Sequence, residues 1–100
     1  MVRAVVADPA DRAAFDNWYR DEHLPDAVKA FAVDAAWRGW SDVNPSIHYA
    51  YYRFASLDRV NAIMAGPEIS ALIAEFDRCW NGRVTRTRDV LVVADEITTR

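Results

Sequence analysis

Two hydrophobic periodicities follow one another along this chain in a fixed order, and that order limits the folds open to it. Short segments rich in β-branched and aromatic residues are typical of strands, and they lie at 2–7, 32–41, 48–55 and 83–97. Apolar residues at helical spacing occur in two longer stretches, after Asp8 and after Gly66. The sequence therefore predicts strand, helix, strand, strand, helix, strand.

Capping and breaking residues mark where the helices begin and end. Asp8 and Pro9 are typical of a helix N-cap and first helical position, and Gly82 is typical of a helix C-terminus. Ser56 is a second N-cap, which opens a short helix before Gly66. Because proline disfavours helical geometry in the residue before it, we expect the first long helix to break or kink at Leu24, next to Pro25.

The order β-α-β-β-α-β is the ferredoxin-like split βαβ pattern, an α+β fold. We expect residues 1–100 to form a single domain with an antiparallel four-stranded sheet and helices on one face only. Just over half of the residues are hydrophobic, including four Trp, four Tyr and four Phe. This is more apolar surface than so short a chain easily buries. A second copy covering the bare sheet face would bury the surplus, so we predict a homodimer, arranged as a dimeric α+β barrel.

Composition and spacing exclude several classes of function. The net charge is −3 and no basic stripe is present, which argues against nucleic acid as a partner. The apolar run at the N-terminus is too short for a signal peptide or membrane span, so we expect a soluble cytoplasmic protein without a membrane partner. Cys79 is the only cysteine, the two histidines lack metal-ligand spacing, and the three glycines are isolated. We therefore expect no metal and no cofactor.

The densest group of chemically useful residues lies near the end of the first helix. Tyr19 and His23 are four residues apart and share a helix face, and Trp18 lies beside them. A histidine at a helix C-terminus is favoured in its protonated form by the helix dipole. Facing an aromatic-lined cleft, His23 could act as a general acid or base. The alternative is that His23 caps the helix and that Trp18 and Tyr19 serve packing.

The segment Trp18-Tyr19-x-x-Glu22-His23-Leu24-Pro25 resembles the signature of the EthD-like family within the dimeric α+β barrel superfamily. The similarity continues through matching positions in the later strands and the turn before the second helix: Arg38, Pro45, Tyr52, Phe54 and Ser56. The resemblance implies a cleft between helices and sheet in each subunit, with His23 facing it. It also implies hydrophobic or aromatic ligands, since related barrels act on bulky aromatic molecules, often without a cofactor.

We predict His23 as the catalytic residue and Trp18, Tyr19, Arg38 and Tyr52 as substrate-binding residues. Arg38 could hold an anionic substrate group, or it could form an ion pair with Asp34, Asp42 or an acidic residue across the dimer. His48 lies where a turn enters a strand, and we expect it at the surface.

Three functions are compatible with these residues. The first is a small-molecule pocket protein that performs cofactor-independent acid–base chemistry on a hydrophobic or aromatic substrate. The second is a noncatalytic ligand-binding or auxiliary protein of a degradation pathway. The third is monooxygenation without a cofactor, of the kind found in antibiotic biosynthesis. The sequence names neither the substrate nor the pathway.

Overall fold

The computed structural model describes residues 1–99, and Arg100, the last residue of the expected domain, lies outside them. Four antiparallel strands form one sheet in the order β2-β3-β1-β4. The strands are β1 (Val2–Val6), β2 (Ala35–Trp40), β3 (Ile47–Arg53) and β4 (Val84–Arg88). The helices are α1 (Pro9–Trp18), the π-helical segment η1 (Tyr19–His23), α2 (Leu24–Phe31), α3 (Leu57–Met64) and α4 (Pro67–Trp80).

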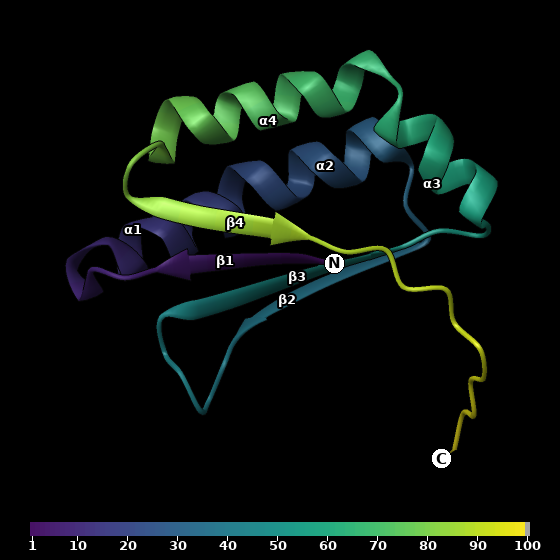
Figure 1. The fold of residues 1–100 in the computed structure, drawn as a ribbon, viewed down its shortest axis with the longest axis horizontal. Helices are drawn as coiled ribbons and strands as arrows, with labels where there is room; N and C mark the ends of the chain where they lie inside the picture. The colour runs from purple at the N-terminus through teal and green to yellow at the C-terminus, as the bar shows by residue number, and fades with distance from the viewer. Residues whose placement is uncertain (100) are drawn as a thin grey trace.

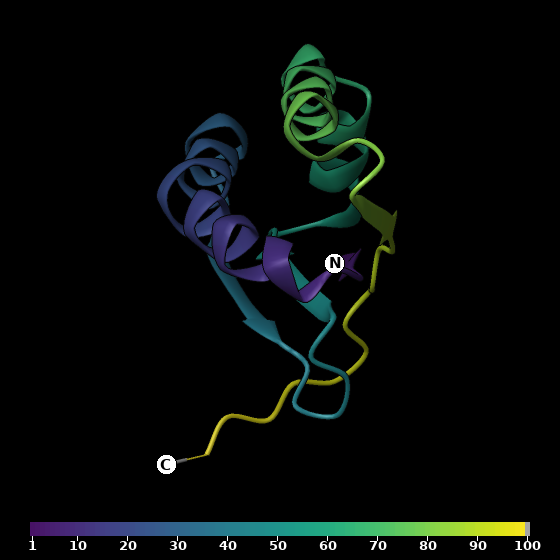
Figure 2. The ribbon, with the colours of Figure 1, turned by 90° about the vertical axis from the view of Figure 1, so that its left-hand side faces the viewer.

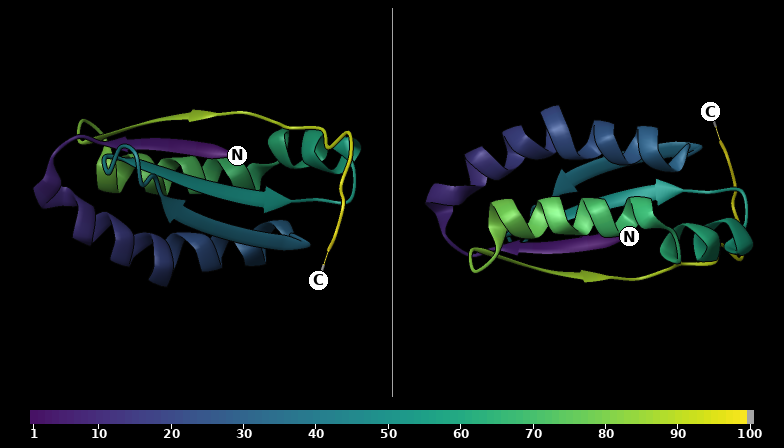
Figure 3. Two further views of the ribbon diagram at one scale, coloured as in Figure 1. Left: turned by 90° about the horizontal axis from the view of Figure 1, so that it is seen from below. Right: turned by 90° about the horizontal axis from the view of Figure 1, so that it is seen from above.

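All the helices lie on one face of the sheet (Figures 1 and 2). Seen from above they stand in front of the strands, and seen from below the strands stand in front of them (Figure 3). The helix starts have the caps that the sequence predicts, because Asp8 accepts from the Ala10 amide and Ser56 accepts from the Arg59 amide. The prediction of a ferredoxin-like α+β fold is confirmed.

Of the expected break or kink at Leu24, a break does not occur, because the chain stays helical through Pro25 to Phe31. The α-helical pattern is nevertheless interrupted just before the proline. The chain widens into η1, where the Leu24 amide donates to the Tyr19 carbonyl five residues earlier. A proline inside a helix lacks an N–H and crowds the carbonyl four residues before it. The π turn shifts the hydrogen-bond register just before Pro25, which places the proline in the first turn of α2. Such π turns are frequent at functional sites.

The last strand is shorter than the sequence predicts. The segment 83–97 was expected to be one strand, but β4 ends at Arg88. Its pairing with β1 finishes with two backbone hydrogen bonds between Met1 and Asp89. Within residues 1–99 no strand pairs with residues 90–93, and their side chains are exposed, although their sequence is Val-Leu-Val-Val. The apolar sequence of residues 90–93 is therefore not sufficient for strand formation, because a strand also needs a second strand to form backbone hydrogen bonds with.

The core lies between α1, α4 and the sheet. Phe15, Tyr19, Phe76 and Trp80 are buried there together with His48, which is completely inaccessible to solvent. The prediction that His48 lies at the surface is therefore wrong. Alternation along β3 directs its side chain to the helix-covered face.

The opposite face of the sheet carries the other aromatic residues of β2 and β3. The Trp37 ring stacks on Tyr51, with centroids 5.3 Å apart and planes 10° apart, and the Arg53 guanidinium lies 5.9 Å from the centre of the Trp37 ring. Trp37 remains 47% exposed. This face, which we call the Trp37 face, has no helix over it (Figure 2).

Candidate functional site

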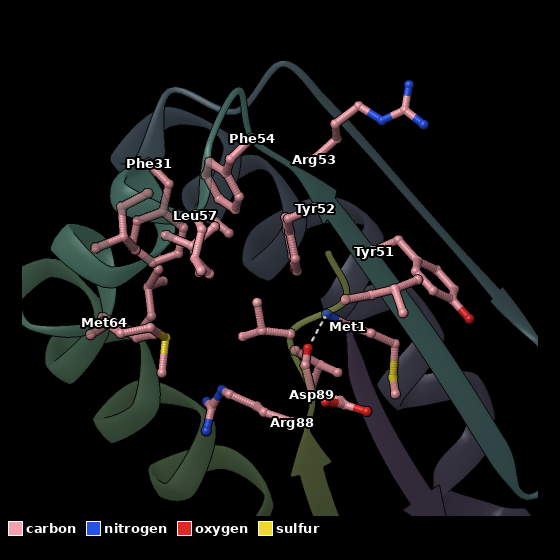
Figure 4. Close-up of a pocket in the computed structure, with 18 of the residues that line it drawn as sticks. Met1, Phe31, Tyr51, Tyr52, Arg53, Phe54, Leu57, Met64, Arg88 and Asp89 are labelled. Atoms are coloured by element: carbon pink, nitrogen blue, oxygen red, sulfur yellow. Dashed lines mark hydrogen bonds between the residues drawn. The ribbon is translucent and has the colours of Figure 1, made fainter. Parts of the chain in front are cut away.

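A cavity of about 510 Å³ is lined by residues of the sheet, of helices α2, α3 and α4, and of the chain after β4, where residues 89–93 contribute. Its volume falls within the usual range for small-molecule pockets. Most of its wall is apolar, with side chains that include Phe31, Phe54, Leu57, Ile63, Met64 and Leu72. Figure 4 shows the Tyr52 ring pointing into this cavity, whereas Tyr51 and Arg53 point away from it.

His23 contributes to the cavity wall from η1. Trp18 holds the imidazole by stacking, with centroids 4.7 Å apart, and the edges of Tyr19 and Phe76 enclose it. Among residues 1–99, Nδ1 of His23 is shielded from solvent and has no hydrogen-bond partner. The ring is therefore fixed by aromatic packing rather than by hydrogen bonds.

Burial, assisted by the charges of Arg86 and Arg88, lowers the pKa of His23 to about 4. Glu75 opposes this shift. The imidazole is therefore neutral at neutral pH. The expectation that a helix dipole favours its protonated form is wrong, because the helix does not end at His23 but continues into α2.

A second, smaller hollow of about 190 Å³ lies on another side of the same imidazole. Its lining is polar and acidic, and consists of Trp18, Asp21, Glu22, His23, Asp26 and Glu75. Among residues 1–99, His23 is the one residue that lines both the apolar cavity and this acidic hollow. The imidazole thus lies between an apolar binding space and a group of carboxylates.

Tyr52 and Tyr19 form a hydroxyl pair, with their oxygens 3.0 Å apart. Tyr52 lines the cavity, and Tyr19 lies behind it with only 1% of its surface exposed. Burial raises the pKa of Tyr52, and burial also raises that of Tyr19 far above its ordinary value. Both hydroxyls therefore keep their protons at neutral pH.

Arg38 does not line the cavity within the described part of the chain. It donates to Asp16 at 2.7 Å, and Trp40 donates to the same carboxylate oxygen at 2.8 Å. The ion pair is thus with Asp16, not with Asp34 or Asp42. The guanidinium also lies 3.3 Å from Nε2 of His48 and 5.9 Å from the centre of the Tyr19 ring.

The structure brings two of the five predicted site residues, His23 and Tyr52, to the cavity. Tyr19 and Trp18 support them from behind, and Arg38 lies in the polar cluster beyond Tyr19. Arg86 and Arg88 also line the cavity, although neither is among the residues predicted from the sequence. Along β4 they follow the buried Val84 at every second position, 84, 86 and 88, so their side chains point to the same face of the sheet. This alternation is the sequence signal that could have identified them.

Two further features of residues 1–99 bear on the class of site. No helix there is long and apolar enough to cross a membrane. No group of three or more His, Cys, Asp or Glu side chains in the same residues is arranged to hold a metal ion.

Two solved structures have similar folds. One is an EthD family protein from Bacillus halodurans, with a TM-score of 0.57 and 18% sequence identity over 89% of this chain and 96% of that one. The other is an antibiotic biosynthesis monooxygenase-like protein from Deinococcus radiodurans, with a TM-score of 0.54 and 10% identity over 96% and 99% of the two chains. No protein-family model matches the chain, and no curated protein matches it in sequence. The chain therefore shares its fold with an EthD family protein, as its sequence resemblance predicts.

Proposed function

We propose that this protein binds a small hydrophobic or aromatic molecule in the cavity between its helices and sheet. The observation that carries the proposal is the cavity itself, which is large enough for such a ligand and mainly apolar, with few polar groups directed into it. The similar folds of an EthD family protein and a monooxygenase-like protein support a small-molecule role.

We further propose that His23 carries out proton transfer without a cofactor. The neutral imidazole accepts a proton from a weakly acidic O–H or C–H of the bound molecule, so that an N–H bond forms as that bond breaks. The negative charge remains on the ligand, where Arg88 stabilises it. Stacking on Trp18 keeps the ring oriented, and the carboxylates of the acidic hollow can receive the proton in turn.

Noncatalytic binding, as in an auxiliary protein, is a second candidate that one observation favours. A general base works best when its pKa lies near the working pH, and burial lowers the pKa of His23 to about 4. The two candidates differ in whether His23 transfers a proton.

We also propose that the protein works as a homodimer in which a second copy covers the Trp37 face. The exposed Trp37 ring, which stacks on the half-buried Tyr51, supports this arrangement.

Binding in the cavity can be tested with N-phenyl-1-naphthylamine, a neutral apolar probe that fluoresces when it leaves water. We expect saturable binding at one site per chain. Leu72→Trp should weaken it about tenfold or more, because the larger ring fills space in the cavity wall. Ala74→Trp, on an exposed position of the same helix, is the matched control and should bind like the wild type. No saturable binding, or equal binding by both variants, would contradict the proposal.

A further inference from the structure

The hydroxyl groups of Tyr52 and Tyr19 form one hydrogen bond with each other, which leaves one of their two protons without an acceptor inside the pair. Two hydroxyls carry two protons, and one proton makes the bond between the two oxygens. Tyr19 is almost wholly buried, and among residues 1–99 its hydroxyl contacts no acceptor other than Tyr52. Leaving a buried hydroxyl proton without an acceptor is costly. Tyr19 is therefore the donor within the pair, and the proton of Tyr52 is left to point into the cavity.

Arg88 adds a positive charge to the same cavity. It extends from the end of β4, and Figure 4 shows its guanidinium turned toward the cavity on the side of Met64. No carboxylate among residues 1–99 forms an ion pair with it, whereas Arg86 pairs with Asp77 at 3.2 Å. The charge of Arg88 opposes the burial that raises the pKa of Tyr52, and adds to the burial that lowers the pKa of His23. Its field therefore reaches the polar groups of the cavity wall.

The cavity thus offers a hydroxyl donor and a positive charge inside an otherwise apolar wall. The one acidic residue that lines it within the described part of the chain is Asp89, whose backbone is tied to Met1 at its edge (Figure 4). An oxyanion attached to an apolar body complements this arrangement, since hydrogen bonds to charged acceptors are about twice as strong as neutral ones.

We propose that the cavity selects apolar or aromatic molecules that carry an acidic oxygen, such as a carboxylate, phenolate or enolate. Tyr52 donates a hydrogen bond to this oxygen, and Arg88 supplies the opposite charge. Tyr19 is a positioning residue, since it donates to the Tyr52 oxygen and thereby strengthens the outer bond. This inference rests on the proposed ligand-binding function and adds the class of ligand.

The test compares 2-naphthoate with 2-naphthamide, two molecules of the same shape that differ in charge, by calorimetry at neutral pH. The wild type should bind the acid about tenfold more tightly than the amide. Tyr52→Phe and Arg88→Gln should each remove most of that preference, and Tyr19→Phe should remove a smaller part. Because Arg88 is exposed, its share of the preference should also fall as salt is added. Arg78→Gln, on the exposed side of α4, is the control and should retain the preference.

The outcomes separate this inference from the function on which it rests. If the neutral probe binds but the acid and the amide bind equally well, the oxyanion inference is wrong while the ligand-binding proposal stands. If the neutral probe does not bind at all, both are wrong. A decline of acid and amide binding in equal measure in Tyr52→Phe would assign that hydroxyl a purely structural role and overturn the inference.

Discussion

His48 is the residue whose position differs most from its expected one, and its surroundings make it sensitive to pH. The rings of Phe15, Tyr19 and Trp40 enclose it with centroids 4.6–5.3 Å away. Arg38 can only donate, so Nε2 of His48 accepts from it and the ring proton sits on Nδ1. Burial, assisted by Arg38, lowers the pKa of His48 to about 4. Folding therefore favours the neutral ring.

This shift predicts that stability is lost in acid. Between pH about 6.5 and about 4 the unfolded chain binds a proton at His48 and the folded chain does not, so the free energy of unfolding decreases as the pH falls. The contribution of His48 should be on the order of 2–3 kcal/mol. Urea unfolding across this range should show the loss, and His48→Phe should remove the part that His48 contributes. His23→Gln should remove a similar part, because burial also lowers the pKa of His23 to about 4. An unchanged pH dependence in His48→Phe would show that His48 is not responsible.

The helix that carries His23 ends at a backbone position unsuited to its residue. Ala32 follows α2 with φ 49° and ψ 53°, in the left-handed region that favours glycine. An alanine in this conformation lowers the free energy of unfolding by roughly 1–2 kcal/mol through strain in the folded chain. A glycine lowers it by roughly 0.4–1 kcal/mol, because glycine gives the unfolded chain more conformational freedom.

Ala32→Gly should therefore stabilise the protein, by roughly 0.5–1 kcal/mol from the difference between these two costs. Thermal or urea unfolding measures the change directly. Ala65→Gly at the end of α3, where φ is −92°, is the matched control and should destabilise. If both substitutions lower stability, the left-handed geometry at Ala32 is not present in solution.

The elements that the sequence predicted well are those set by local pattern. Alternation along β3 places His48, Ala50 and Tyr52 on one face, which is the face that packs against the helices. The end of β4 and the continuity at Pro25 depend instead on which backbone lies alongside and on a shift in hydrogen-bond register, and neither is visible in a local window.

The candidate site divides in the same way. His23 and Tyr52 were found from a motif, but Arg88 reaches the cavity only because β4 lies beside β1 at the edge of the sheet. The burial of His48 was not predicted, because the turn just before it suggested a surface position, whereas its alternation with Ala50 and Tyr52 along β3 indicates the buried face. Contacts between distant segments therefore decide which of several plausible residues share a cavity.

Apolar side chains remain exposed on the Trp37 face and along residues 90–93, although both segments also contribute to the cavity wall. The chain after β4 runs on from the sheet toward the C-terminus (Figure 1). A chain of this size gains stability by burying such surface against a second copy. Sedimentation equilibrium at micromolar concentration should therefore give twice the 11.4 kDa mass of one chain.

A charge placed on the Trp37 face should separate the subunits. We expect Trp37→Lys to shift the mass toward that of the monomer. Val43→Lys introduces the same charge at a position that is 95% exposed in the β2–β3 turn, and it should stay dimeric. A wild-type protein that remains monomeric at these concentrations would argue against the dimer.

The central proposal is that His23 transfers a proton to or from an apolar molecule held in the cavity, and deuterium exchange into 2-tetralone in D2O tests it most directly. This bicyclic ketone has an acidic C–H, and NMR follows its exchange. The protein should accelerate exchange in a saturable manner, and the rate should fall as pH decreases through about 4, where His23 gains a proton. His23→Gln should abolish the acceleration, and Leu72→Trp should weaken it by reducing binding. Exchange no faster than with an equal concentration of free imidazole, or undiminished in His23→Gln, would contradict the proposal.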